Sequence, residues 1–137
     1  DEKTVVLKTD FQDRLPEIEG KEEIIKMLFM NLIHNAIKYN RKNGSVTVKA
    51  DRGEDDEAVR VCVRDTGIGI PEDKLPLIFE QFYRIKDTEE RIEGSGLGLS
   101  IVQLIVKALG GSIHAESETG KGTAFTVLLP LKQKQGG

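Results

Sequence analysis

Two groups of residues have the types and spacing that nucleotide chemistry needs. Asp65 ends an apolar strand pattern, and the run Asp-Thr-Gly-Ile-Gly-Ile-Pro over 65–71 follows with two glycines. Glycine adopts backbone angles closed to other residues, so this backbone can approach a flat ligand while the Asp65 carboxylate hydrogen-bonds to it. Upstream, Asn31 and Asn35 lie four positions apart, which places their neutral oxygens on one side of a helix, where a Mg-nucleotide can use them. Together, in this order, the two groups indicate an ATP site.

The helix that carries the asparagines also carries a lysine on the same side. At about 100° per residue, Asn31, Asn35 and Lys38 fall within a wedge of about 60°, whereas the apolar residues occupy another side. An Asn oxygen can replace one water on Mg²⁺, and Lys38 can offset phosphate charge. Tyr39 can lie beside a base. For this helix taken by itself, a solvated polar face is the alternative.

A second glycine cluster, Gly94-Ser95-Gly96-Leu97-Gly98-Leu99, opens a later helix. Exposed N–H groups at a helix start form an anion site. The polar stretch 89–93 precedes it in place of a strand, and no lysine follows the glycines, which excludes a dinucleotide fingerprint and a P-loop. Glycines for helix packing or a hinge are the alternative. The charged segment 82–93 is expected to be a mobile loop, which suggests a lid that closes over phosphates.

Length, charge and composition exclude several classes of protein. The chain has 137 residues, which predicts one domain over 1–137 with a frayed tail at 131–137. The net charge is −3 and the basic residues are scattered, so no nucleic-acid partner is expected. No apolar run approaches the ~20 residues of a membrane span, and no signal-peptide pattern opens the chain. Cys62, the one cysteine, lies among valines and is expected to be a buried, inert thiol in a reducing cytoplasm.

Apolar periodicity predicts a mixed succession of elements. We expect an edge strand at 4–7, an extended linker at 15–18, a helix at 21–39, strands at 45–50 and 58–65 around an acidic hairpin tip at 51–57, a short helix at 72–79 with Pro71 as its first residue, a helix at 97–109 that Gly110-Gly111 stops, and strands at 112–117 and 123–129 around a turn at 119–122. Strand pairs alternate with helices without a regular strand-helix-strand order. This favours an α+β fold, a two-layer α/β sandwich whose mixed, mostly antiparallel sheet has helices on one face.

The succession of motifs resembles the catalytic ATP-binding domain of two-component sensor histidine kinases. Residues 31–39 look like their N box, 65–70 like the first glycine box, 79–84 like the F box, 94–99 like the second glycine box and 120–123 like the short final one. All five stand in the family's order and span most of the chain. The wider group includes gyrase, the ninety-kilodalton heat-shock chaperone and MutL, and the resemblance implies their Bergerat-type ATP-binding fold.

The resemblance also implies roles for single residues. Asn35 would bind Mg²⁺, with Asn31 supporting the metal and phosphate network, and Asp65 would accept a hydrogen bond from the adenine amino group. The other implied contacts are Lys38 and Arg84 with phosphate, Tyr39 beside the adenine, Gly67, Gly69 and Ile70 along the ring, Gly94, Gly96, Leu97, Gly98 and Leu99 at the phosphates, and the Thr123 hydroxyl in the adenine pocket. Phe79 and Phe82 would anchor the lid by packing.

The family transfers the terminal phosphate of ATP to a histidine on a separate dimeric helical hairpin, where Glu or Asp follows the histidine. This chain contains only His34 and His114, and neither is followed by an acidic residue, so both are expected to be structural or exposed. The resemblance therefore implies an ATP:protein-histidine phosphotransferase domain without its acceptor. The implied partners are that hairpin and a response regulator. The isolated domain is expected to be monomeric, and its parent a membrane-bound sensor with this domain in the cytoplasm.

Other functions of the same family remain as alternatives. Hydrolytic relatives of the gyrase and chaperone kind carry a glutamate one helical turn before the Mg-binding asparagine, where this chain has Asn31. An amide is not basic and cannot take a proton from water, which disfavours hydrolysis. A serine kinase of the anti-sigma type, a module that uses ATP only to change shape, and a pseudokinase stay open. The F box and the long lid favour the histidine-kinase branch.

Overall fold

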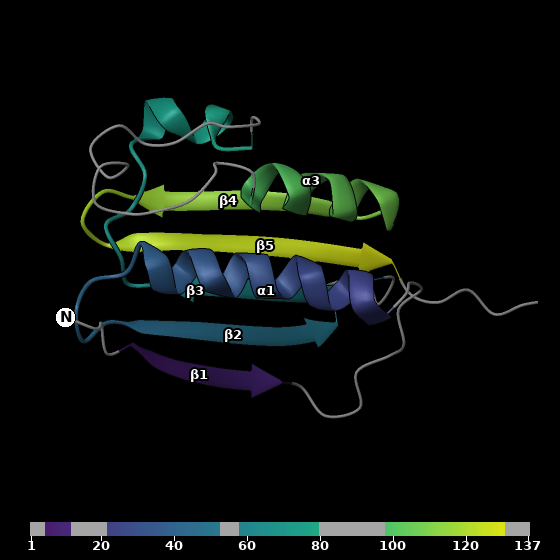
Figure 1. The fold of residues 1–137 in the computed structure, drawn as a ribbon, viewed down its shortest axis with the longest axis horizontal. Helices are drawn as coiled ribbons and strands as arrows, with labels where there is room; N and C mark the ends of the chain where they lie inside the picture. Colours follow the sequence, from purple (N-terminus) through teal and green to yellow (C-terminus); the bar gives the residue numbers. More distant parts are fainter. Residues whose placement is uncertain (1–4, 12–21, 53–57, 80–97, 131–137) are drawn as a thin grey trace, which may run out of the picture.

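The computed structural model describes residues 5–11, 22–52, 58–79 and 98–130. Its elements in chain order are β1 (Val6–Phe11), α1 (Glu22–Lys38), β2 (Ser45–Arg52), β3 (Ala58–Asp65), the 3₁₀ helix η1 (Glu72–Leu77), α3 (Gly98–Ala108), β4 (Ser112–Glu118) and β5 (Gly122–Pro130). The five strands form one sheet in the order β1-β2-β3-β5-β4, in which β1 runs parallel to β2 and every other pair is antiparallel. Helices α1 and α3 pack together against one face of this sheet (Figure 1). The predicted α+β two-layer sandwich with a mixed, mostly antiparallel sheet is confirmed.

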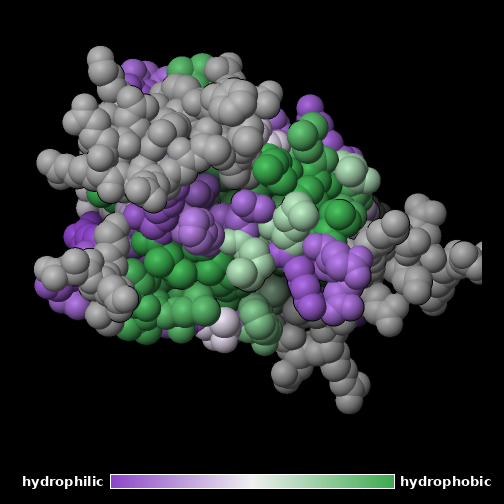
Figure 2. Space-filling view, in the orientation of Figure 1, coloured by the Kyte–Doolittle hydropathy of each residue, from purple (hydrophilic) through white to green (hydrophobic). Residues whose placement is uncertain are grey.

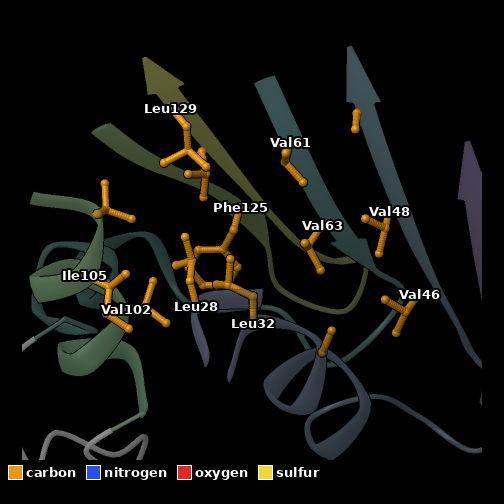
Figure 3. Close-up of a cluster of buried hydrophobic side chains, with 14 of the residues drawn as sticks. Leu28, Leu32, Val46, Val48, Val61, Val63, Val102, Ile105, Phe125 and Leu129 are labelled. Carbon is orange, nitrogen blue, oxygen red and sulfur yellow. The ribbon is translucent and has the colours of Figure 1, made fainter. Parts of the chain in front are cut away.

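The core lies between the two helices and the inner face of the sheet. Along β3, Val59, Val61 and Val63 are buried while the residues between them face the other way, because successive side chains of a strand alternate. On α1, Leu28 and Leu32 lie four residues apart and are fully buried. Figure 3 shows their side chains directed at those of the strands. Each such leucine contributes about 2 kcal/mol through burial, so this layer contact holds α1 in place over β3.

The C-terminus of α3 is closed by the two glycines that the sequence marks. Gly110 has a φ of +78°, and its N–H donates to the carbonyl of Lys107 at 3.0 Å. The N–H of Gly111 donates to the carbonyl of Val106 at 2.9 Å. This pair of bonds satisfies carbonyls that the helix leaves without a partner, and its left-handed residue favours glycine. The predicted stop is confirmed.

The short helix begins at Glu72 as predicted, but it differs from its prediction in type, in its end and in the place of Pro71. Residues 72–77 form a 3₁₀ helix, and Pro71 precedes it with a φ of −56° and a ψ of 141°. That ψ is extended, so Pro71 is not the first helical residue as predicted. Pro76 lies inside the element, has no N–H to donate and disfavours the α conformation at Leu75. These restrictions explain why the segment does not continue as an α-helix to residue 79.

Three further expectations need correction. Cys62 is only half-buried, because the alternation of β3 gives the inner face to its neighbours and leaves Cys62 on the outer face, opposite Lys49 of β2. The edge strand exists but covers Val6–Phe11, later than expected. Asp51, expected in a hairpin tip, lies in β2 and pairs with Arg60 at 3.1 Å.

Several expectations lie outside the described residues. These are the linker at 15–18, residues 53–57 of the hairpin tip, the proposed lid at 82–93 and the tail at 131–137, whereas Arg52 of the expected tip lies in β2. Neither of the two α-helices in the described part of the chain has the length and apolar character needed to span a bilayer.

Candidate nucleotide-binding site

Asp65 is a buried carboxylate at the end of a central strand. It is 8% exposed, and its Oδ1 accepts hydrogen bonds from the N–H of Gly67 at 2.8 Å and of Thr123 at 3.1 Å. No donor among the described residues contacts Oδ2, so this oxygen can accept from a ligand. Burial raises the pKa of the Asp65 carboxyl, and the bonds from Gly67 and Thr123 lower it by less. The carboxylate is therefore oriented by one oxygen and available through the other.

The loop after Asp65 is held by backbone contacts at its glycines. A Cβ on Gly67 would meet the carbonyl oxygen of Tyr39 and would lie 3.0 Å from Asp65 Oδ1. Gly69 has a φ of +76°, and a Cβ there would meet the carbonyl of Glu118. The glycines thus let the loop pack against the end of α1 and the end of β4. The sequence argument assigned that close approach to a ligand, whereas the structure shows that protein backbone already requires it.

The asparagine row of α1 ends beside this loop. The carbonyl of Tyr39 accepts a hydrogen bond from the N–H of Ile68 at 3.2 Å, which ties the end of α1 to the glycine loop. Asn31 and Asn35 are both half-buried, and Asn31 Nδ2 donates to the carbonyl of Met27 at 2.8 Å. Lys38 Nζ lies 5.6 Å from the centroid of the Tyr39 ring, a cation–π contact. The end of α1 that carries Lys38 and is followed by Tyr39 therefore lies beside the glycine loop that follows Asp65.

Thr123 makes two contacts within the protein that the sequence did not indicate. Its hydroxyl oxygen lies 2.8 Å from Ser117 Oγ, while its backbone N–H holds Asp65. Ser117 Oγ also donates to the carbonyl of Gly122 at 2.9 Å and accepts from the N–H of Ile70 at 2.7 Å. Ser117 was missed by sequence reasoning. The sequence did contain a signal for Ser117. Ile113 and Ala115 lie on one face of β4, and Ser117 places a hydroxyl at the next position on that face, where an apolar residue is expected.

Asn40 and Arg41 were also missed, although they directly follow the predicted N box. Asn40 is 2% exposed, its Nδ2 donates to the carbonyl of Ser45 at 2.9 Å, and its Oδ1 accepts from the Thr66 hydroxyl at 3.0 Å. Arg41 donates to the carbonyl of Thr66 through Nε and to that of Gly120 through Nη2, both at 2.6 Å. No local pattern could reveal the partners of Arg41, because Thr66 and Gly120 lie 25 and 79 residues away from it in the sequence.

The remaining predicted residues fall into two groups. Leu99 packs against the hydrophobic core, Ile70 is buried within it, and Gly98 begins α3. Phe79 packs edge to face on Phe125 with ring centroids 6.1 Å apart, and its role as an anchor of the lid stays a prediction. The positions outside the described residues are Phe82, Arg84, Gly94, Gly96 and Leu97.

Comparison with known proteins identifies the group to which this arrangement belongs. Residues 20–133 match the family described as histidine kinase-, DNA gyrase B-, and HSP90-like ATPase. The chain is a member of this family. Among curated members, the sensor histidine kinase WalK of Bacillus subtilis (strain 168) is 40% identical over 124 residues, which cover 90% of this chain and 20% of WalK. The signal transduction histidine-protein kinase ArlS of Staphylococcus aureus (strain USA300) is 40% identical over 121 residues, which cover 88% of this chain and 26% of ArlS.

Solved structures of family members have the same fold. The mycobacterial sensor histidine kinase MprB superposes with a TM-score of 0.80 at 25% identity, over 95% of this chain and 84% of that one. Full-length ShkA in complex with AMPPNP gives a TM-score of 0.81 at 31% identity, over 95% of this chain and 26% of that one. The resemblance to histidine kinase catalytic domains is confirmed. The chain spans only about a fifth to a third of the length of the curated relatives it matches.

Proposed function

We propose that this chain is the catalytic part of a sensor histidine kinase, which binds Mg-ATP and transfers the γ-phosphate to a histidine on a separate helical hairpin. One observation carries the proposal. The buried carboxylate of Asp65 is held through Oδ1 by Gly67 and Thr123, and no described donor contacts its Oδ2. A single oriented acceptor of this kind suits the amino group of adenine. The two-component relatives make ATP-dependent signalling the context in which to test it.

The residues present fit a magnesium nucleotide. Asp65 Oδ2 would accept from the adenine amino group, the Asn35 amide oxygen would bind Mg²⁺, and Lys38 would contact phosphate. The described residues contain no cluster of three or more His, Cys, Asp or Glu that could hold a metal alone. Mg²⁺ needs few protein ligands because phosphate oxygens and waters complete its shell, so one neutral amide oxygen is a sufficient contribution. When bound, ATP would supply the phosphoryl group for transfer.

The chemistry of α1 favours transfer over hydrolysis. Asn31, one turn before Asn35, is an amide that donates to the carbonyl of Met27, so it cannot accept a proton from water. The acidic residues of α1 are Glu22 and Glu23, both in its first turn, far along the helix from Asn35. No acidic residue of α1 is therefore placed to act as the base that hydrolytic relatives use.

An acceptor outside this chain is consistent with its histidines. His34 and His114 are both exposed, and His114 Nε2 lies 3.4 Å from a Glu116 carboxylate oxygen at the surface. Neither lies in the Asp65 site. A histidine that receives phosphate from this site would then come from another segment of the parent protein or from a partner.

An apolar groove on α1 supports the proposed hairpin partner. It is lined by Ile25, Phe29, Met30 and Ile33, with Glu22 and Lys26 also at its wall, and Met30 is 66% exposed. Figure 2 shows apolar surface on the side of the molecule that α1 covers in Figure 1. An amphipathic helix packs its apolar face into such a groove. The groove lies on the same helix as Asn31 and Asn35, so a hairpin docked there would lie close to the nucleotide site.

The decisive experiment combines the chain with the helical hairpin of its parent kinase, Mg²⁺ and γ-labelled ATP. We expect label on the hairpin that is acid-labile and base-stable, as phosphohistidine is, and no label on the chain alone. A hairpin with its acceptor histidine replaced is the matched control. Acid-stable label on serine or threonine would instead support a serine kinase. Brisk phosphate release without an acceptor would support a hydrolase, because loss of general-base assistance should slow turnover by roughly 10²–10⁴.

A further inference from the structure

Three segments far apart in the sequence meet at the end of the sheet where β3 ends at Asp65. Figure 1 places the end of α1, the end of β3 and the turn between β4 and β5 at this end. The N–H of Gly120 donates to the carbonyl of Ile68 at 2.8 Å, which joins the turn to the glycine loop. Arg41, three residues after α1, bonds to both of the other segments.

The guanidinium of Arg41 spans these segments as a fork. Nε donates to the carbonyl of Thr66 at 2.6 Å, and Nη2 donates to the carbonyl of Gly120 at 2.6 Å and more weakly to that of Gly67 at 3.4 Å. Its own backbone N–H donates to Asn40 Oδ1 at 2.8 Å, which fixes the start of the side chain. Hydrogen bonds from a charged donor are about twice as strong as neutral ones. A planar fork holds several acceptors in one fixed geometry, which lysine cannot do.

One peptide unit connects Arg41 to the carboxylate. The carbonyl of Thr66 accepts from Arg41, and the N–H of Gly67, on the same peptide, donates to Asp65 Oδ1. A trans peptide is planar, and its C=O and N–H point in opposite directions. A bond that fixes the oxygen therefore also aims the N–H. A positive charge at the oxygen further polarises the peptide and makes its N–H a better donor.

We propose that Arg41 is a positioning residue for the nucleotide site, which orients the Asp65 carboxylate through the peptide between Thr66 and Gly67 and so sets the affinity for adenine. The inference rests on the proposed role of Asp65. It adds a residue that does not touch the nucleotide and lies on the surface, where a charge is ordinarily dispensable. The guanidinium acts at a distance of one peptide from the carboxylate.

A double-mutant cycle tests the proposal in the chain of residues 1–137. Arg41→Met removes the fork, and it should weaken ATP binding by about tenfold in calorimetry while GTP binding stays unchanged. In an Asp65→Asn background, the same substitution should change ATP affinity by less than about twofold, because the group it orients is already lost. Arg64→Met is the matched control. It removes the same charge from an exposed position next to Asp65, with no bond to the loop among the described residues, and it should bind ATP like the unaltered chain.

The outcomes separate this inference from the proposed function. If Asp65→Asn leaves ATP affinity unchanged, the adenine site itself is wrong and the role of Arg41 falls with it. If Asp65→Asn weakens binding but Arg41→Met does not, or if Arg41→Met weakens it equally in both backgrounds, the positioning role alone is overturned. Should Arg41→Met fail to fold, Arg41→Lys is carried through the same cycle, because it keeps the charge and loses the fork.

Discussion

At the scale of one residue, the Asp65 carboxylate that is proposed to bind the ligand lowers the stability of the empty protein when it is ionised. Its carboxyl is buried, and burial raises its pKa more than the bonds from Gly67 and Thr123 lower it. The native state therefore binds a proton at Asp65 more readily than the unfolded chain does. It follows that ionisation of this group destabilises the empty fold as pH rises, and that the cost is complete once pH exceeds the raised pKa.

Asp65→Asn should remove this dependence. Asparagine can still accept both backbone bonds through its carbonyl oxygen but carries no charge. At low pH we expect the variant and the unaltered chain to have similar free energies of unfolding. As pH rises from the ordinary aspartate pKa to the raised one, the free energy of unfolding of the variant should increase relative to that of the unaltered chain. Urea unfolding at a series of pH values from about 3 to about 7 measures the difference. A difference that does not change with pH would contradict the raised pKa.

Asn35 is predicted to act through the metal. Asn35→Ala should weaken ATP binding with Mg²⁺ by about tenfold, or about 1.4 kcal/mol, because it removes an oxygen ligand. Binding without Mg²⁺ should change little. Titration calorimetry with and without EDTA makes the comparison, and Lys42→Ala, a neutralised exposed residue beyond the helix, is the control. Equal losses under both conditions would show that Asn35 is a structural polar residue.

At the scale of elements, the start of β5 lies against the end of β3 with no room for a side chain. Gly122 has a φ of +121°, and a Cβ there would meet the carbonyl oxygen of Asp65 and lie 2.8 Å from its carbonyl carbon. Gly120, in the same turn, has a φ of +83° but no atom within 4 Å of its Cβ position. A side chain at Gly120 would meet only the strain of a left-handed backbone, whereas a side chain at Gly122 would also clash with the backbone of β3.

Substitution of these glycines should give unequal results. Gly120→Ala should cost about 1 kcal/mol from its backbone angle alone, whereas Gly122→Ala should cost about 3 kcal/mol or more because the strand must also move. Only Gly122→Ala should weaken ATP binding, since the movement displaces the N–H of Thr123 from Asp65. Thermal unfolding and calorimetry report the two effects. Equal stability losses would mean that β5 can shift freely against β3.

At the scale of the whole molecule, the helix layer leaves apolar surface uncovered. Helix α1 exposes Met27 and Met30, and the edge strand β1 exposes Val6, Leu7 and Phe11. Met30 borders the groove proposed for the hairpin. A docking surface and the nucleotide site can be tested separately, because Met30 points out of the core that holds Asp65 in place.

Met30→Glu should separate docking from nucleotide binding. A charge in the apolar groove should slow transfer of label to the hairpin by about tenfold or more, while ATP affinity stays unchanged. Leu104→Glu is the matched control, because Leu104 is 68% exposed on α3 and lies outside the groove. If label transfer is equally fast with Met30→Glu, the hairpin docks on another surface of the protein.

The sequence by itself determined most of the elements and the carboxylate at the centre of the proposed site. Helical spacing located α1, alternation located β2 and β3, and glycines located the end of α3, because each of these signals is local to its element. The position of Asp65 at a strand end, followed by glycines, was sufficient to identify the carboxylate that the structure buries.

Only the tertiary structure decided how distant segments meet. Asp65 bonds to Thr123, Arg41 to Gly120 and Ser117 to Ile70, and these bonds join residues 58, 79 and 47 positions apart. Periodicity reports which side of an element is apolar, but it does not report what lies opposite. The sheet register, which periodicity does not report, places Lys49 of β2 opposite Cys62. Hydrogen-bond partners of this kind come together only when the strands have formed the sheet. The sheet therefore decides that Arg41 bonds to the carbonyls of Thr66 and Gly120 instead of remaining a solvated charge.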